Sequence, residues 1–458
     1  MVKLRLESGK DILPLKWRFM SITIKLTKKV AIITALLISV ALMGACSSNS
    51  NKNGASSTST TTVNRFNFGT VSYNPKATGI PSFYTPPNNL PNKPNGTLIR
   101  YQKVLGVPGV PSGATLYRIM FYSKTIYGKG IPESGYAIVP PTPAPAGGYT
   151  ILSWAHGTTG AAPICAPSIF QSFVYLPPGL NNFITDNYLI AATDYEGLGT
   201  SVTIHPYLLG QSEGQGVLDA AIAAQQIPGV NASNKVFIYG HSQGGQSALF
   251  AGQLAPTYAP SLKILGVVAA APATGFQFIV EVTPTDNSVL AFTFPMLWTW
   301  SQAYTNFPTS LIFTKEGMQI GSQYVGSVCD GNLGAILNNY PASDLFQPNA
   351  SLNGVVQDFA MQNDPGSVPI PAPILIVQGT ADTTVYPQFT DFNVQQTCKV
   401  TNDSLDYVLL SGANHSTIVS DEALPISQWM QAIAAGTPNN STCGLNPDYI
   451  SGPGTGVP

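Results

Sequence analysis

A serine set between glycines is the part of the sequence best suited to chemistry. Residues 240–244 are Gly-His-Ser-Gln-Gly; the apolar run Val236–Tyr239 precedes them and a stretch rich in small residues follows. This pattern predicts a strand that turns sharply into a helix, with Ser242 at the bend. Gly240 and Gly244 suit such a bend because they carry no side chains where the chain turns most tightly. A serine exposed in this way is a candidate nucleophile.

The Gly-x-Ser-x-Gly pattern occurs a second time at residues 210–214, and only its surroundings separate the two matches. Ser212 follows the short run Tyr207–Leu209 and precedes a helical stretch, Val217–Ala224. We therefore predict that Ser212 caps the start of a helix. Ser242, which follows a run suited to a buried strand, remains the predicted nucleophile.

A serine hydroxyl becomes a good nucleophile when an imidazole takes its proton, and the chain has four histidines. His156 and His205 precede Ser242, and His241 is its neighbour and is expected to point away from it. His415 alone follows Ser242 in the chain, after a strand-like run and a polar loop. That position fits the chain order serine, acid, histidine, so His415 is the predicted general base.

The acid that orients the imidazole is expected between the serine and the histidine. Ile374–Gly379 has the pattern of a buried strand that ends at glycine, and Asp382 follows just beyond it. A loop aspartate can also simply cap its own turn, and Asp364 and Asp391 are competing candidates. We predict that Asp382 completes a Ser-Asp-His triad.

Acyl transfer at such a serine also needs backbone N–H groups that stabilise the oxyanion of the intermediate. The residue after the nucleophile normally supplies one of them, which here is Gln243. Two loops that follow predicted strands offer the second donor: residues 156–160, with Gly157, and residues 194–199, which begin at Asp194. Backbone donors leave little trace in side-chain identity, so the residues alone leave this choice open.

The candidate residues follow short apolar runs of the kind that form buried parallel strands, which predicts an α/β domain with a mostly parallel sheet flanked by helices. With 44% hydrophobic residues, the chain can bury a large core, and we predict one catalytic domain over residues 65–435. Residues 275–350 are predicted to be a helical cap or lid insertion, because the connection there is too long for a loop. Its aromatic residues either line an acyl pocket or form the core of the cap.

The N-terminal residues have the pattern of an export signal. Residues 1–45 contain positive charges, then the apolar run Val30–Met43, which is too short to span a bilayer, and then small residues before Cys46. Residues 42–46 resemble a bacterial lipobox, with Met43 in place of the usual leucine. They predict a lipoprotein signal peptide and a lipid anchor on Cys46 at the bacterial cell envelope. Ordinary cleavage and secretion is the alternative, and Met20 is an alternative start.

The two ends of the mature chain are expected to be irregular. Residues 46–64 are a Ser/Thr/Asn tract that cannot bury enough apolar surface to fold, which predicts a disordered tether. Residues 436–458 are rich in Pro, Gly and Asn and are expected to form an irregular tail.

Charge and cysteine content narrow the possible partners. Eight of the 21 basic and two of the 22 acidic residues lie in residues 1–45, which leaves a formal charge of −7 on the remainder. That charge balance provides no basic surface for binding nucleic acid, and no closely spaced His/Cys cluster or phosphate-binding loop indicates a metal or a cofactor.

The cysteines beyond Cys46 are even in number, which predicts two disulfides with three possible pairings. They are Cys165, Cys329, Cys398 and Cys443.

The motifs in their order along the chain resemble those of the secretory lipase family, the lipase A-like α/β-hydrolases of fungi and bacteria. The resemblance spans roughly residues 97–435 and rests on Ser-Gly-Tyr-Ala-Ile-Val-Pro (134–140), Ala-His-Gly-Thr-Thr-Gly (155–160), Asp-Tyr-Glu-Gly-Leu-Gly (194–199), Gly-His-Ser-Gln-Gly-Gly (240–245), Gly-Thr-Ala-Asp (379–382) and Asn-His (414–415). It implies the α/β-hydrolase fold and the triad Ser242, Asp382 and His415. The elbow departs from the Gly-x-Ser-Gly-Gly often seen in fungal members, so their chain-length preferences are not carried over.

The same resemblance implies details that the residues leave open. It favours Asp194 over Gly157 for the second oxyanion donor, and it favours the pairs Cys165 with Cys329 and Cys398 with Cys443. It also implies esters of hydrophobic acyl groups as substrates.

The expected function is therefore hydrolysis of carboxylic esters by a lipase or carboxylesterase, through an acyl-enzyme on Ser242 and without a cofactor. Polyesters and acetylated sugars are alternative substrates for the same triad. A hypothesis from another class is a non-catalytic binding module of the cell envelope, because a hydrolase fold does not fix function. An intact serine, acid and histidine in the expected order favours the enzyme.

Overall fold

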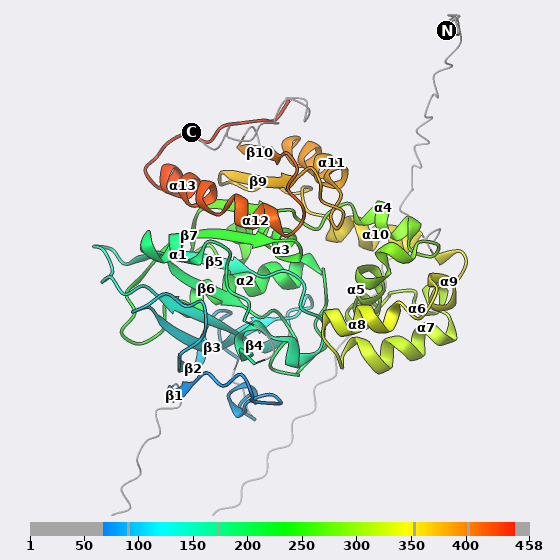
Figure 1. Ribbon diagram of the computed structural model, residues 1–458, viewed down its shortest axis with the longest axis horizontal. Helices are drawn as coiled ribbons and strands as arrows, with labels where there is room; N and C mark the ends of the chain where they lie inside the picture. The colour runs from blue at the N-terminus through cyan, green and yellow to red at the C-terminus, as the bar shows by residue number, and fades with distance from the viewer. Residues whose placement is uncertain (1–66, 89–91, 172–173, 351–353, 401–403, 445–458) are drawn as a thin grey trace, which may run out of the picture. The chain divides into compact units, whose positions relative to one another are not determined.

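The computed structural model describes residues 67–88, 92–171, 174–350, 354–400 and 404–444 (Figure 1). The predicted signal peptide, the predicted tether and Cys46 lie outside these residues, as does the tail beyond residue 444. Within the described ranges, none of the helices has the length and apolar character needed to cross a membrane.

A single sheet runs through the centre of the fold and, in the described part of the chain, has ten strands. The strands are β1 (Asn67–Ser72), β2 (Leu98–Leu105), β3 (Thr115–Lys124), β4 (Gly130–Val139), β5 (Tyr149–Ala155), β6 (Leu189–Thr193), β7 (Ala232–His241), β8 (Lys263–Ala270), β9 (Ile374–Gly379) and β10 (Leu405–Leu410). Their spatial order is β1-β2-β3-β4-β6-β5-β7-β8-β9-β10. From β6 to β10 in this order every neighbouring pair is parallel. The neighbouring pairs β2–β3, β3–β4 and β4–β6 are antiparallel. The predicted mostly parallel sheet is confirmed.

Helices cover both faces of this sheet (Figure 1). They are α1 (Leu180–Thr185), α2 (Gly210–Ala224), α3 (Gln243–Tyr258), α11 (Pro387–Cys398), α12 (Thr417–Asp421) and α13 (Ala423–Ala434). Short 3₁₀ turns lie at Ser82–Tyr84, Pro163–Cys165, Pro167–Ile169 and Asn287–Val289, and a π-helical turn lies at Gly321–Val325.

Each face of the sheet has its own apolar core, because successive side chains of a strand point to opposite sides. On β7, Val236 and Ile238 pack in the core that contains α2 and α3, whereas Phe237 and Tyr239 pack in the core that contains α1 and α13. Both faces of the strand are therefore buried, which explains why its sequence is continuously apolar.

A helical insertion separates β8 from β9 and gathers in Figure 1 as one group of helices. It contains α4 (Phe276–Val282), α5 (Leu290–Ala303), α6 (Thr309–Ile312), α7 (Lys315–Ile320), α8 (Asp330–Leu337), α9 (Ala342–Leu345) and α10 (Gly354–Asn363), so it continues past residue 350. Most of its aromatic residues, including Phe294, Trp300 and Phe313, form a core within the insertion itself. The alternative that these rings mainly build their own core is therefore the correct one.

Two disulfides occur among the described residues, Cys165 with Cys329 and Cys398 with Cys443. These are the pairs that the family resemblance implied. The first ties the segment after β5 to the insertion just before α8. Beside it, Gly160 and Cys329 form an isolated β-bridge and the Asp330 N–H donates to the Thr159 carbonyl at 3.0 Å.

Replacing Cys165 and Cys329 by alanine should lower the free energy of unfolding by about 5 kcal/mol, because the bond closes a loop of 164 residues in the unfolded chain. The corresponding change at Cys398 and Cys443, which closes 45 residues, should cost about 4 kcal/mol. Urea unfolding of the two double variants measures both losses. A Cys165/Cys329 variant as stable as the wild type would contradict the structural role of this bond.

Candidate active site

Ser242 lies on the turn between β7 and α3, with φ 59° and ψ −120°. A residue other than glycine rarely adopts such a backbone conformation, and surrounding contacts must hold it. The Ser242 N–H donates to the Ala270 carbonyl at 3.0 Å, and the Ser242 carbonyl accepts from the N–H groups of Gly245 and Ala273, both at 2.9 Å. The neighbouring chain thus fixes the strained turn.

Two glycines allow this turn to press against β5. A Cβ on Gly240 would lie 1.9 Å from the Gly244 carbonyl oxygen, and a Cβ on Gly244 would lie 1.9 Å from the Ala155 carbonyl oxygen. No side chain fits at such distances. The turn therefore sits at the carboxyl ends of β5 and β7, where the strand order reverses because β6 pairs with the other edge of β5. Parallel sheets bind ligands at such a reversal.

Asp382 and His415 form a hydrogen bond of 2.8 Å between Oδ2 and Nδ1. The carboxylate also accepts from the N–H groups of Thr384 and Val385 and, at 3.1 Å, from the Gln378 amide. Burial favours the protonated acid, but the hydrogen bonds, led by that from His415, outweigh burial and hold the pKa of Asp382 below its usual value. An anionic acceptor at Nδ1 keeps the proton there and leaves Nε2 free to act as a base.

His241 links this pair to the elbow. Its Nε2 donates to the His415 carbonyl at 2.8 Å, and the two imidazole rings are 4.6 Å apart. Since His241 directly precedes Ser242, the contact places the loop of His415 beside the turn at Ser242. Burial lowers the pKa of His241 to about 4, so its ring is neutral. This contact could not be predicted, because the two residues are 174 positions apart in the chain.

The other two histidines are occupied elsewhere. His156 and His205 are buried, and the Nδ1 atom of each contacts a backbone carbonyl, that of Gly157 at 2.7 Å and that of Glu196 at 3.0 Å. Burial lowers the pKa of His156 to about 4 and that of His205 to about 3. Neither imidazole contacts Asp382 in the described structure.

The competing aspartates also have other partners. Asp364 accepts from the N–H of Gly275 at the start of α4, at 2.9 Å, and Asp391 accepts from the Tyr407 hydroxyl at 2.6 Å. Each of these carboxyls therefore has another partner, and Asp382 is the one found against His415.

The prediction that Ser212 caps a helix is wrong. Helix α2 begins at Gly210, so Ser212 lies within its first turn, and the Ser212 hydroxyl donates to the Glu196 carboxylate at 2.6 Å. The residue is buried, unlike a nucleophile at the end of a strand. A helix can begin earlier than its apolar periodicity suggests when small residues precede that periodicity.

The candidate oxyanion donors differ in availability. Gln243 is the first residue of α3, and an N–H in the first turn of a helix has no acceptor within that helix. The Asp194 N–H donates to the Ser134 carbonyl at 2.8 Å, and its buried carboxyl accepts from the hydroxyls of Ser134 and Ser168. The N–H of Asp194 is therefore already paired, which corrects the expectation that favoured Asp194 over Gly157.

The loop of residues 156–160 passes close to the turn at Ser242. A Cβ on Gly157 would lie 3.4 Å from the His241 carbonyl oxygen and 2.7 Å from the Tyr175 hydroxyl. The Thr158 hydroxyl lies 2.8 Å from the Tyr207 hydroxyl, and Tyr207 lines the cavity described next. This loop is thus the better placed of the two for a second donor.

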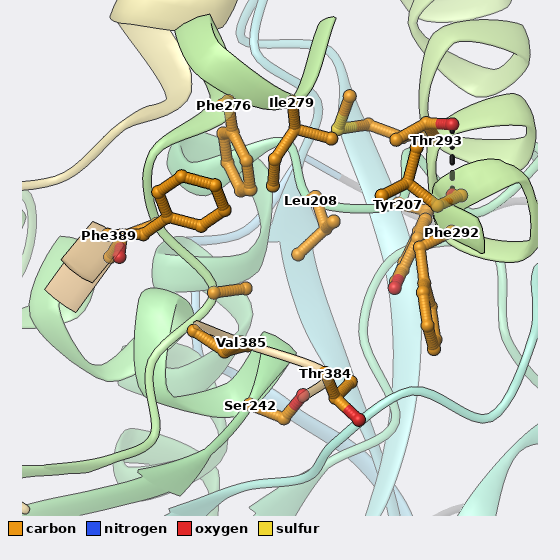
Figure 2. Close-up of a pocket in the computed structure, with 14 residues that line it drawn as sticks. Tyr207, Leu208, Ser242, Phe276, Ile279, Phe292, Thr293, Thr384, Val385 and Phe389 are labelled. Carbon is orange, nitrogen blue, oxygen red and sulfur yellow. Dashed lines mark hydrogen bonds between the residues drawn. The ribbon is translucent and has the colours of Figure 1, made fainter. Parts of the chain in front are cut away.

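A cavity lies beside Ser242 (Figure 2). Figure 2 shows Ser242 on one side and Phe276 and Ile279 of the insertion on the opposite side. Most of the wall is apolar and comes from the insertion, the 207–208 segment, the loop after β9 and the start of α11, including Leu208, Phe292, Met296, Val385 and Phe389. Such a lining suits a hydrophobic group. No cluster of metal-ligating side chains occurs in the part of the chain that the structure describes.

Comparison with known proteins agrees with this fold. A model of the family described as Secretory lipase matches residues 180–441, more than half of the chain. Lipase A of Moesziomyces aphidis is 24% identical over 195 residues, which covers 40% of this chain but only 41% of that protein. Lipase 10 of Candida albicans is 23% identical over 404 residues, which covers 79% of this chain and 82% of that protein.

The crystal structure of Candida antarctica lipase A in its closed state has the same fold. It superposes with a TM-score of 0.67 at 19% identity and covers 82% of this chain and 90% of that chain. Together with the family match, the large parallel sheet and the serine on its strand-to-helix turn, this likeness assigns the fold. The chain belongs to the secretory lipase family and has the α/β-hydrolase fold.

Proposed function

We propose that the protein is a serine hydrolase of the lipase or carboxylesterase type, which cleaves esters of hydrophobic acyl groups through an acyl-enzyme on Ser242. The observation that carries the proposal is the Asp382–His415 hydrogen bond next to a strained serine that opens onto an apolar cavity. Membership of the secretory lipase family and relatives named as lipases support the same reaction. A binding module without catalysis would not need a strained serine beside a paired histidine and aspartate.

In the proposed reaction, His415 Nε2 takes the proton of Ser242 Oγ while this oxygen attacks the ester carbonyl carbon. Asp382 holds the imidazole in the required tautomer and stabilises the imidazolium. The Gln243 N–H binds the developing oxyanion, with the loop of residues 156–160 as source of a second donor. The imidazolium protonates the departing alcohol, and a water activated by His415 then releases the acid from Ser242.

Family membership and the two disulfides indicate an exported protein. The proposal adds attachment to the bacterial envelope through an acylated Cys46, with residues 46–64 as the tether. This part is supported by the lipobox-like sequence alone.

Labelling with an alkyl organophosphonate tests the nucleophile. One phosphonate per chain should attach to the wild type, none to Ser242→Ala, and almost none to His415→Ala within the same time, because the hydroxyl then keeps its proton. Ser212→Ala is the matched control and should label normally, since Ser212 belongs to the other Gly-x-Ser-x-Gly segment. Mass spectrometry of the intact protein counts the label. A wild type that neither labels nor hydrolyses esters would favour the binding module.

Asp382→Asn tests the orienting acid. The asparagine can still accept from the N–H groups of Thr384 and Val385, so the loop should keep its shape, but its amide would force the wrong tautomer on His415. We expect kcat for p-nitrophenyl esters to fall by about 10⁴-fold with little change in KM. Asp391→Asn is the control and should retain wild-type kcat. Full turnover in Asp382→Asn would contradict the assigned triad.

Ile279→Trp tests whether the cavity receives the acyl chain, because its larger side chain would fill the wall opposite Ser242. The variant should lose about 10-fold or more in kcat/KM for long-chain p-nitrophenyl esters while hydrolysis of the acetate is little changed. Val282→Trp, at an exposed position of the same helix, serves as the control. Equal losses for acetate and long-chain esters would contradict the assignment. An emulsified triglyceride measured in parallel separates a lipase from an esterase of short esters or acetylated sugars.

A further inference from the structure

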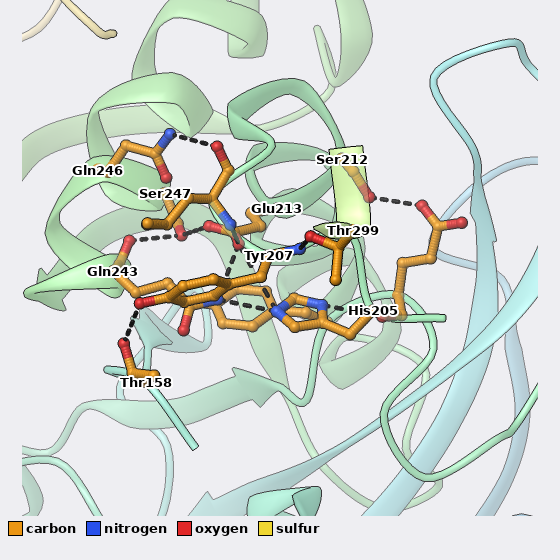
Figure 3. A network of polar contacts seen from close by, with 12 residues as sticks. Thr158, His205, Tyr207, Ser212, Glu213, Gln243, Gln246, Ser247 and Thr299 are labelled. Carbon is orange, nitrogen blue, oxygen red and sulfur yellow. Dashed lines mark hydrogen bonds and ion pairs between the residues drawn. The ribbon is translucent and has the colours of Figure 1, made fainter. Parts of the chain in front are cut away.

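The side chain of Gln243 is buried beneath the nucleophilic turn, and both hydrogens of its amide have acceptors (Figure 3). Its Nε2 lies 2.7 Å from Glu213 Oε1 and 2.9 Å from His205 Nε2. His205 Nδ1 lies 3.0 Å from the Glu196 carbonyl and must donate its proton there, which leaves Nε2 as an acceptor. The two acceptors therefore fix Gln243 from two directions.

Glu213 joins several parts of the site through one carboxylate. Its Oε1 accepts from the Gln243 amide and from the Leu208 N–H, both at 2.7 Å, and its Oε2 accepts from the Ser247 hydroxyl at 2.6 Å. Leu208 lines the cavity and has a φ of 57°, a conformation that needs support from its surroundings. Ser247 lies one turn after Gln243 in α3 and contacts the Gln243 carbonyl at 2.8 Å. Glu213 thus connects the cavity wall with the first turn of α3.

The same cluster reaches the loop on the other side of the nucleophile. The Tyr195 ring stacks on His205, with ring centroids 5.6 Å apart and planes 10° apart. The Tyr195 hydroxyl donates to the His156 carbonyl at 2.9 Å, where the loop of residues 156–160 begins. Both proposed sources of oxyanion donors are therefore held by one set of buried contacts.

We propose that Glu213 and His205 are positioning residues that hold the backbone N–H of Gln243 at the oxyanion by fixing the Gln243 side chain. The inference rests on the proposed ester hydrolysis. A donor stabilises an oxyanion only if it is already in place, and a shift of about 1 Å can cost about 100-fold in rate. A buried carboxylate is in general no more stabilising than an apolar side chain. The presence of Glu213 under the turn is therefore better explained by its orienting Gln243 than by a gain in stability.

Gln243→Met tests the proposal directly, because it keeps the backbone N–H and the approximate shape of the side chain but removes both amide donors. We expect kcat per active site to fall by about 10-fold to 100-fold, with KM for p-nitrophenyl esters within about 3-fold of the wild type. Titration with the organophosphonate gives the number of active sites. The inhibition constant of an alkyl trifluoromethyl ketone, whose serine adduct carries an oxyanion, should rise by the same factor as kcat falls.

Glu213→Leu should give a similar loss, and Glu213→Gln should restore most of the activity. A glutamine can accept from Gln243 and Leu208 through its carbonyl and donate to Ser247 through its amide. Asp219→Asn is the matched control: Asp219 is equally buried on the same helix but accepts from Asn95 and Tyr258. It should keep the wild-type kcat per active site even if the melting temperature falls.

The proposal fails if Gln243→Met keeps the wild-type kcat and inhibition constant, if its loss is confined to KM, or if Glu213→Gln is as impaired as Glu213→Leu. Should Glu213→Leu not fold, Gln243→Met and Glu213→Gln decide the question. Failure of the proposed function gives a different result: the wild type would then neither label nor hydrolyse esters, or Ser242→Ala would hydrolyse them as fast as the wild type.

Discussion

The close crossing of β5 and the turn at Ser242 is the constraint on which the site depends. The Ala155 carbonyl oxygen occupies the place that a side chain on Gly244 would need, so the end of β5 and the start of α3 are in backbone contact. Such contact brings the loop that follows β5, the strained serine and the free N–H groups of α3 into one small volume. The strain is tolerated because the neighbouring strand and the first turn of the helix supply hydrogen bonds to Ser242 on both sides.

The proximity of the residues that follow parallel strands could be predicted from a simple geometric rule. Strands that run in the same direction end at the same edge of the sheet, so Ser242, Asp382 and His415 could be expected near one another although the chain separates them widely. The same rule explains why the Asp382–His415 contact could be predicted without knowing where the helices lie. The apolar character of β7 and β9 on both faces, which is visible in the sequence, defined the strands from which these loops emerge.

Contacts that depend on side chains from distant elements could not be predicted in this way. His241 was expected only to point away from Ser242, and its contact with His415 was not foreseen. The Gln378 amide that supports Asp382 comes from an otherwise apolar strand, which gives no sign of this contact. Glu213 lies in the second Gly-x-Ser-x-Gly segment, and nothing in its position beside Ser212 predicts a contact with Gln243. Whether the Asp194 N–H has a hydrogen-bond partner also cannot be predicted from the sequence, because it depends on the pairing of β4 with β6.

The covalent tie between Cys165 and Cys329 has a mechanical consequence for entry into the cavity. It fixes one end of α8 to the segment that follows β5, at a point supported further by the bridge between Gly160 and Cys329. While this bond is intact, the start of α8 cannot move far from the segment that follows β5. Helix α4, which is anchored through Gly275 to Asp364, and the segment around Thr384 line the cavity outside this tie, so a small displacement of either would change its width.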